Sequence, residues 1–392
     1  RPAAPAAPAL TTFPQPLVGT VTRARDTLVT GERVAFGRRG LTGTYVWMLP
    51  RGAQVTVTGQ RAGQYQLRMG AEPVAFTPDS LVTLGGPAPA TPPALGPISV
   101  RPAAGWVDVV VPADSAAFLV EESGNGVSLT VYGRAPGAGT PKIAAGMITG
   151  AVWSAPAPDA ARLDLALAQR PWGFQVFYEG AGDLVLRLRR PPAIDPRDPL
   201  RGRRIVIDPG HPPVGAVGPT GLTEADANLA VATRVAERLR ERGAQVVMTR
   251  TGREAPSGSS SQTVDLAFRV AEALQADGEL FVALHNNAFP EGINPFTSYG
   301  TEAYYFHGQS QELAQALNAE IAAVTRIPNL GAKMSDFAVI RQTWMPAVLT
   351  ESLFMMFPQQ EAALRDPGFI DRLAQAHVRG IESFLRSRAG GR

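Results

Sequence analysis

Cysteine is absent from the 392 residues of this chain, and histidine occurs only four times. Without cysteine there are no disulfides and no thiolate chemistry, so a metal site would have to use His, Asp and Glu. Lysine is nearly absent as well: Lys142 and Lys333 are the two lysines, and 37 basic residues minus 2 leaves 35 arginines. In a chain this rich in Ala and Pro, codon bias explains the arginine excess better than an arginine-specific ligand does.

Long hydrophobic runs are also missing. No run approaches the ~18 apolar residues that cross a bilayer, so no transmembrane segment is expected. The chain opens "RPAAPAAPAL" and lacks a charged start followed by an apolar signal core. We interpret residues 1–15 as a Pro/Ala-rich linker, left by processing or set by an artificial boundary.

A net charge of +3 with a pI near 9.4 suits weak attraction to anionic surfaces and does not point to nucleic acid.

The first half of the chain has the sequence pattern of β-strands. Residues 17–84 alternate apolar and polar positions between turn signals, which predicts a small β-barrel domain at 16–90. The run "GGPAPATPPALGP" cannot form a helix or a ladder and predicts a linker. Further strand signals without a helical period predict a second β domain at 97–192, a sandwich.

After Arg203 the pattern changes to alternating strands and helices. Strands are predicted at "RIVID", "QVVMT", "LFVAL", "EAYYF" and "AVLT". Helices are predicted after residue 224 and near 263–276, 310–325 and 368–387. The expected fold class is therefore multidomain: two small all-β domains followed by an α/β catalytic domain with a mostly parallel sheet flanked by helices.

Three ionisable side chains come at the ends of these predicted strands. His211 follows "RIVID", His285 follows "LFVAL", and Glu351 follows "AVLT". Ligands of open α/β sheets bind beyond the carboxyl ends of the strands, so these side chains are expected on one rim. Singly, each has an ordinary alternative: a strand-end His forms a hydrogen bond, and Glu351 accepts a buried salt bridge.

Glu224 is a fourth candidate for the same rim. Thr223 and Asp226 fit a capping box, which places Glu224 in the first turn of a helix after a Gly/Pro-rich loop. Alone, Glu224 would be a partner of the helix dipole. Together with His211 and His285 it makes the two-imidazole, one-carboxylate set of many hydrolytic zinc sites.

The remaining polar residues near these positions have less specific interpretations. His307 and His377 lack such a setting, and His377 lies in a helical pattern, so we interpret it as structural. Asp208 either accepts a hydrogen bond from His211 and orients it, or only forms the turn.

The motifs "IVIDPGH", "LHNNA", "GTEAYYF" and "MPAVLTE", together with a Glu at a helix start, resemble the zinc-dependent N-acetylmuramoyl-L-alanine amidases of amidase type 3. The resemblance covers residues 203–392. It implies Zn²⁺ held by His211, Glu224 and His285, with Glu351 as the catalytic acid/base. The implied reaction is cleavage of the amide between N-acetylmuramic acid and L-alanine of the stem peptide in peptidoglycan.

The resemblance further implies an exported protein of the periplasm or cell envelope, with an envelope activator as a potential partner. Two departures bear on specificity: Pro212 and Pro213 stand where the family commonly has glycines, and "SLFMMFP" replaces a Gly-Phe-rich stretch. Residues 16–90 are similar to bacterial SH3-like domains, and 97–192 to AMIN-type β domains. Two alternatives stay open: a zinc peptidase acting within the stem peptide, and a catalytically silent wall-binding scaffold.

Overall fold

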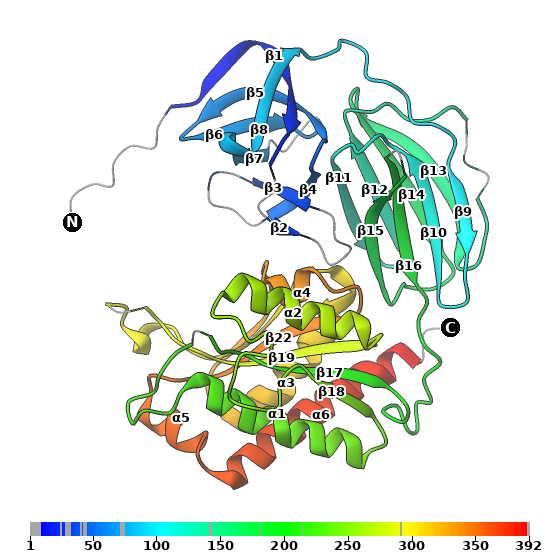
Figure 1. Cartoon of the computed structure of the whole chain (residues 1–392). Coiled ribbons are helices and arrows are strands. Elements are labelled where there is room, and N and C mark those ends of the chain that lie inside the picture. Colours follow the sequence, from blue (N-terminus) through cyan, green and yellow to red (C-terminus); the bar gives the residue numbers. More distant parts are fainter. Residues whose placement is uncertain are drawn as a thin grey trace. The chain divides into compact units, whose positions relative to one another are not determined.

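Figure 1 shows a computed structural model of the chain. The structure describes residues 9–23, 26–27, 33–39, 41, 45–70, 75–139, 141, 143–180, 182–213, 215–290 and 292–389. The chain divides into two compact units, Arg1–Arg190 and Pro191–Arg392. The linker predicted at residues 1–15 lies in part outside the described residues.

The first unit is built from strands, with one short 3₁₀ turn, η1 (Asp79–Leu81). The strands are β1 (Thr11–Val21), β2 (Asp26–Thr27), β3 (Arg33–Arg39), β4 (Tyr45–Pro50), β5 (Gln54–Arg61), β6 (Gln64–Arg68), β7 (Ala75–Pro78), β8 (Val82–Pro87), β9 (Ser99–Pro102), β10 (Trp106–Pro112), β11 (Phe118–Ser123), β12 (Gly126–Tyr132), β13 (Ile148–Ala157), β14 (Ala160–Leu167), β15 (Gly173–Glu179) and β16 (Asp183–Arg189). Their alternating pattern buries one face; in β5, Val55 and Val57 are buried while Gln54 is exposed.

Most of these strands join one antiparallel sheet instead of two separate small domains. Twelve strands pair in the order β13-β14-β12-β11-β4-β3-β7-β6-β5-β1-β8, with β2 on β3. The join is the pairing of β4 with β11, where Met48 lies opposite Phe118. The expectation of two small all-β domains is therefore wrong as a fold class, because this pairing continues the sheet across the intervening chain. Strands β15-β16-β10-β9 form a second sheet, whose inward side chains share a core with those of β12 and β14.

The second unit alternates strands and helices, as the sequence predicts. Its elements are β17 (Arg204–Pro209), α1 (Glu224–Glu241), β18 (Gln245–Met248), α2 (Gln262–Gln275), β19 (Leu280–Asn287), η2 (Pro295–Thr297), β20 (Thr301–Tyr305), η3 (Gly308–Ser310), α3 (Gln311–Thr325), β21 (Asn329–Met334), α4 (Ala338–Arg341), β22 (Ala347–Phe354), α5 (Pro358–Ala363) and α6 (Pro367–Ala389). The predicted helices near 263–276, 310–325 and 368–387 are confirmed as α2, α3 and α6.

The sheet of this unit is mixed, so the expectation of a mostly parallel catalytic sheet is wrong. Its order is β18-β17-β19-β22-β20-β21. Strands β18, β17, β19 and β22 are mutually parallel, but β20 runs antiparallel to β22 and carries β21 with it. The physical reason is the connection from β19 to β20, whose described residues contain only the short η2 turn. A parallel return needs a long crossover, usually a helix, whereas a loop lets the chain reverse direction.

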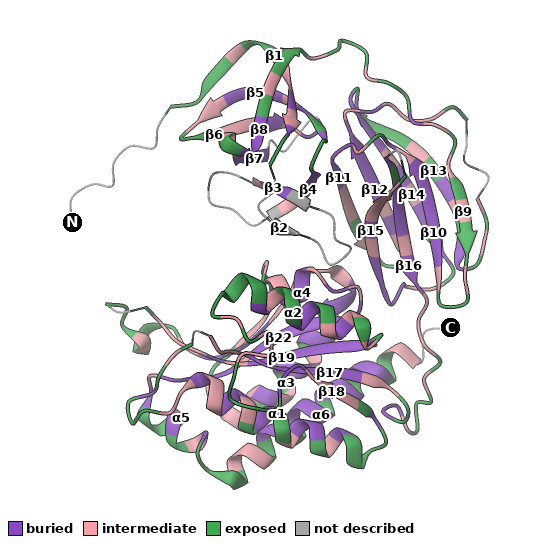
Figure 2. Cartoon of the chain, viewed as in Figure 1, coloured by how far each residue is buried: buried purple, intermediate pink, exposed green. Residues whose placement is uncertain are grey.

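Helices cover both faces of this sheet, with α1, α3 and α6 on one face and α2 and α4 on the other (Figure 1). The central strands β17, β19 and β22 are buried, and the outer helix faces are exposed (Figure 2). Helix α1 begins where the sequence predicts, because the Thr223 side chain accepts a hydrogen bond from the Asp226 amide at 3.1 Å. None of the helices in the described part of the chain is long and apolar enough to span a membrane.

The buried side chain of His377 in α6 should make the stability of this unit depend on pH. Its side chain is fully buried, and Nδ1 donates to the Leu373 carbonyl oxygen at 2.8 Å. Burial lowers the pKa of His377 from 6.5 to about 4. Between those pH values the unfolded chain binds a proton that the folded chain does not. The free energy of unfolding should therefore fall as pH drops from 6.5 towards 4, by up to about 3 kcal/mol for this residue.

The measurement is the Tm of the Pro191–Arg392 unit between pH 7 and pH 5, compared with a His377→Asn variant. Asparagine keeps a donor for the Leu373 carbonyl but does not titrate. The wild-type Tm should decrease more over this range than the variant Tm. Equal decreases would contradict the assignment of this effect to His377.

Candidate metal centre

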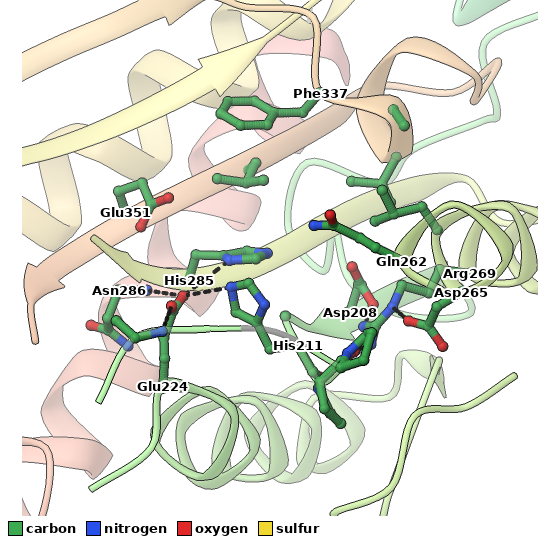
Figure 3. Close-up of a pocket in the computed structure, with 18 of the residues that line it drawn as sticks. Asp208, His211, Glu224, Gln262, Asp265, Arg269, His285, Asn286, Phe337 and Glu351 are labelled. Carbon is green, nitrogen blue, oxygen red and sulfur yellow. Dashed lines mark hydrogen bonds and ion pairs between the residues drawn. The ribbon is translucent and has the colours of Figure 1, made fainter. Parts of the chain in front are cut away.

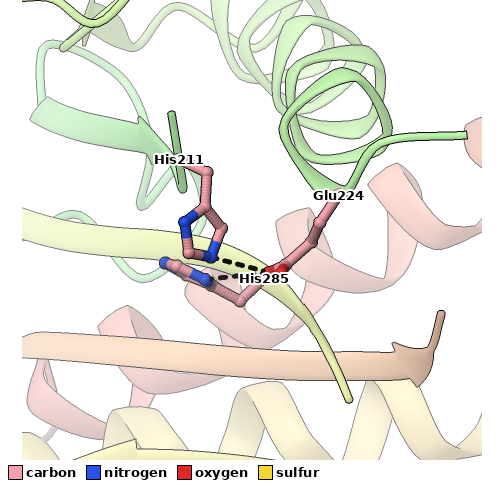
Figure 4. A group of neighbouring side chains, drawn as sticks. All are labelled: His211, Glu224 and His285. Carbon is pink, nitrogen blue, oxygen red and sulfur yellow. Dashed lines mark hydrogen bonds and ion pairs between the residues drawn. The ribbon is translucent and has the colours of Figure 1, made fainter. Parts of the chain in front are cut away.

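Three of the predicted side chains meet at the carboxyl ends of the central strands (Figure 4). His211 follows β17, Glu224 is the first residue of α1, and His285 lies in β19. Nε2 of His211 and Nδ1 of His285 each lie 3.2 Å from Oε1 of Glu224. One ligand atom of each residue lies within 4.8 Å of the other two. This spacing allows all three to contact one small cation.

The donor set fits a zinc ion on chemical grounds. Two imidazole nitrogens and one carboxylate oxygen leave room for a fourth, exchangeable position. Burial alone would raise the pKa of Glu224, but hydrogen bonds from His211 and His285, together with their charge, hold that pKa well below its usual range. Glu224 is therefore a carboxylate at neutral pH, which is the form that binds a metal.

Gly210 allows the two imidazoles to approach each other. A Cβ at this position would lie 2.2 Å from Cε1 and Nε2 of His285, closer than side-chain atoms ever come. With glycine there, the ring centroids of His211 and His285 lie 4.9 Å apart. Only glycine is compatible with this approach.

The loop that carries His211 is held by a buried arginine of α2. His211 has a φ of 57°, in the left-handed region that a non-glycine residue occupies at a cost of order 1–3 kcal/mol. The Arg269 side chain is only 2% exposed and donates to the carbonyl oxygens of His211 and Pro212, both at 3.1 Å. It also donates to the Pro209 carbonyl at 2.8 Å, to Asp208 at 2.6 Å and to Asp265 at 2.7 Å. Arg269 thus keeps the loop in this conformation.

A second buried arginine connects two of the ligand-bearing segments. Arg250 donates to the carbonyl of Gly210 at 2.9 Å and to that of Ala225 at 2.7 Å. These carbonyls neighbour His211 and Glu224 in the sequence. Arg250 therefore fixes the start of α1 relative to the loop after β17. We call Arg250 and Arg269 the arginine clamp.

Glu351 lies in β22, in register with His285 on the neighbouring parallel strand. Its side chain lines the same cavity as the three predicted ligands (Figure 3). The Oε2 atom is buried and has no hydrogen-bond partner among the residues that the structure describes. Burial, with the negative charges of Glu224 and Glu302, raises the pKa of Glu351 well above its ordinary value. A carboxyl group of this kind is suited to proton transfer near neutral pH.

The cavity has a volume of about 310 Å³. Beside the residues already named, its wall is largely apolar and its polar groups are few. Phe337 and Leu349 contribute apolar surface, Gln262 and Asn287 contribute amides, and Pro212 lies in the loop after β17. Such a mixture is typical of a small-molecule or substrate site.

Other sequence-predicted residues lie outside the three-residue group. Among the described residues, Asp208 makes no hydrogen bond to the His211 imidazole; it accepts from Arg269 and Thr249, so it acts on His211 only through the clamp. His307 is bonded to the Arg341 carbonyl at 2.8 Å, and His377 to that of Leu373. Both histidines are held elsewhere in the fold.

Neither arginine of the clamp was predicted from the sequence. A signal existed for Arg269, because a charged residue at this point of the helical pattern falls on the buried face, four residues after Asp265. Arg250 directly follows a short strand and carried no local signal. Its role depends on carbonyl groups that are distant in sequence.

Comparison with known proteins shows which family this chain resembles. The model of a family described as N-acetylmuramoyl-L-alanine amidase matches residues 205–383. The chain is 33% identical over 205 residues to the uncharacterized protein YqiI of Bacillus subtilis, covering 51% of this chain and 93% of YqiI. It is 33% identical over 196 residues to the N-acetylmuramoyl-L-alanine amidase LytC of Bacillus subtilis, covering 48% of this chain. Only 37% of LytC is spanned.

A solved structure is similar as well. The catalytic domain of CwlV, an N-acetylmuramoyl-L-alanine amidase from Bacillus (Paenibacillus) polymyxa var. colistinus, is 33% identical in sequence. The match covers 47% of this chain and 98% of that domain, with a TM-score of 0.41.

Proposed function

The chain belongs to the N-acetylmuramoyl-L-alanine amidase family, and from this premise we propose that it hydrolyses the amide between N-acetylmuramic acid and L-alanine in peptidoglycan. One observation carries the proposal beyond family membership. Glu351 lines the same cavity as the group His211, Glu224 and His285, and its carboxylate has a raised pKa. A metal site and a proton-transfer group are the two parts that metal-assisted amide hydrolysis requires.

In this proposal His211, Glu224 and His285 hold Zn²⁺, as the donor set favours. When bound, zinc supplies Lewis-acid chemistry, which makes water more acidic and a carbonyl more electrophilic. Glu351 accepts the proton of the attacking water and delivers it to the leaving nitrogen, because an amide expels its amine poorly unless that nitrogen is protonated. The arginine clamp keeps His211 in place.

For the first unit, Arg1–Arg190, we propose a role in binding the cell wall. We propose that the SH3-like segment 16–90 and the AMIN-like segment 97–192, which share the twelve-stranded sheet, bind the wall together, and that 203–392 is the catalytic domain. The supporting observation is that all four histidines lie beyond Arg203. The proposed location is the periplasm or cell envelope, where peptidoglycan is found, with an envelope activator protein as a potential partner.

Product analysis tests the proposed bond. Purified peptidoglycan should be digested with the full chain loaded with zinc, and the products examined by mass spectrometry. The expected products are stem peptides with a free L-alanine amino group and glycans with a free lactyl carboxylate. Cleavage inside the stem peptide would indicate a peptidase instead, and no cleavage by the zinc-loaded chain would indicate a binding scaffold.

Separating the two units should separate cleavage from wall binding. The fragment Pro191–Arg392 should fold and cleave soluble muramoyl-peptides at a rate close to that of the full chain, but bind intact sacculi less tightly, because tethering raises the local concentration of substrate. Sedimentation with sacculi measures the binding. A folded, zinc-loaded fragment that fails on soluble substrate would show that the first unit takes part in catalysis.

A further inference from the structure

A second cavity of the Pro191–Arg392 unit has a lining unlike that of the metal centre. It measures about 350 Å³. Its described lining consists of Phe296, Tyr299, Thr325, Ile327, Leu353, Phe357, Gln359, Gln360, Ala363 and Phe369. Four of these ten residues are aromatic, and none is an aspartate, glutamate, lysine or arginine. The cavity therefore suits an uncharged ligand with apolar faces.

The aromatic rings are held at the cavity by local structure. Phe296 lies in η2, where the Asn294 side chain accepts a hydrogen bond from the Phe296 amide at 3.0 Å. The Phe296 ring meets Phe357 at 5.1 Å between centroids, and Tyr299 meets Phe357 at 4.9 Å. Even so, Phe296 is 73% exposed. A large aromatic side chain that is positioned but left in solvent marks a surface for a ligand.

Hydrogen-bonding groups accompany the rings. The side-chain oxygen of Gln360 accepts a hydrogen bond from the Phe354 amide at 2.7 Å, which fixes this side chain. The NH₂ group of Gln360 then remains to donate hydrogen bonds to a ligand. Gln359 is exposed, so its side-chain amide is accessible to a ligand. Apolar ring faces beside neutral donors and acceptors complement a pyranose ring, which has C–H groups on its faces and hydroxyl and acetamido groups around its edge.

The aromatic cavity adjoins the strands of the metal centre. Leu353 in its wall lies two residues after Glu351 in β22. The Phe354 ring packs on two other aromatic rings. Its centroid lies 5.0 Å from that of Phe289 and 6.4 Å from that of Tyr299. Phe289 comes four residues after His285 in the sequence. Both cavities are thus lined by residues from the carboxyl end of β22. A ligand in the aromatic cavity lies at the same end of the sheet as the reacting bond.

We infer that the cavity formed by Phe296, Tyr299 and Phe357 binds an N-acetylated sugar of the glycan strand, away from the bond that is cleaved. This inference rests on the proposed function, because that function supplies the saccharide. Among the described lining residues none is charged, which argues against the stem peptide, whose carboxylates and amino groups would require ionic partners.

Direct saccharide binding tests the inference without any need for cleavage. The 392-residue chain is titrated calorimetrically with a β-1,4-linked trisaccharide of N-acetylglucosamine, and the Phe296→Ala and Tyr299→Ala variants are titrated in parallel. Each variant should bind about tenfold more weakly, because it loses a stacking surface. Phe268→Ala is the matched control: Phe268 is a 36% exposed phenylalanine of α2 outside the cavity, and its loss should change affinity less than twofold.

Three outcomes would overturn the inference: no trisaccharide binding by the wild-type chain at millimolar concentration, equal weakening in all three variants, or unaltered affinity in Phe296→Ala and Tyr299→Ala. A concentration-dependent dimer that Phe296→Ala dissociates in sedimentation velocity would also overturn it, since a second copy would then cover the rings. Failure of the proposed function looks different: the product analysis shows no muramoyl–alanine cleavage, whatever the trisaccharide does.

Discussion

Replacing Glu351 with glutamine should lower the turnover number by ~10²- to 10⁴-fold while the chain keeps one zinc ion. General acid–base catalysis contributes a factor of this order. Glutamine has nearly the same volume and lacks only the basicity that accepts a proton. Because Glu351 lies outside the three-residue ligand group, its loss should leave the metal content unchanged.

The measurements are steady-state rates on a soluble muramoyl-peptide and zinc content by atomic absorption on the same sample. Glu302→Gln is a useful comparison, because Glu302 lies opposite Glu351 on β20 but is paired with Lys333 and accepts a hydrogen bond from Asn287. It should cost far less turnover than Glu351→Gln. Near-normal turnover in Glu351→Gln, or loss of its zinc with the fold intact, would show that Glu351 has a different role.

Removing a ligand should have a still larger effect, on both metal and activity. His211→Ala and His285→Ala each leave two of the three proposed ligands, and an incomplete site of this kind should lose metal affinity steeply. Both variants should show no measurable amidase activity and zinc content far below one ion per chain.

His377→Asn serves as the control for histidine replacement, because His377 is buried in α6 and bonded to Leu373. It should retain zinc at neutral pH. Circular dichroism establishes that each variant is folded. Full zinc occupancy in folded His211→Ala and His285→Ala would exclude both residues as ligands.

The sequence predicted that the candidate site residues lie close together at one edge of the sheet. This was possible because a strand can be recognised from the pattern of a few consecutive residues. Where parallel strands are buried, their carboxyl ends meet at one edge, so His285 and Glu351 were expected to be neighbours, and they are in register. Glu224 was placed by the cap at Thr223, which is also local. The roles of these residues remain predictions, but their proximity followed from short patterns.

The features that the sequence did not predict depend on distant contacts or on very short elements. The reversal of β20 and the junction of β4 with β11 are pairings between strands whose own patterns do not specify a partner. Strand β21 and helices α4 and α5 span only four to six residues, too few to establish a period. The charge-free aromatic cavity, likewise, brings together residues from 296 to 369.

The arginine clamp has an evolutionary consequence. Arg250 and Arg269 hold the loop after β17 through the carbonyl oxygens of residues 209–212, and every amino acid, proline included, carries that group. Side chains in this loop can therefore diverge without releasing His211. Pro212 and Pro213, which line the cavity and stand where the resemblance to amidase type 3 leads us to expect glycines, are an instance of that freedom. The surface that this loop presents to the cavity can change in such a protein while the position of His211 is inherited unchanged.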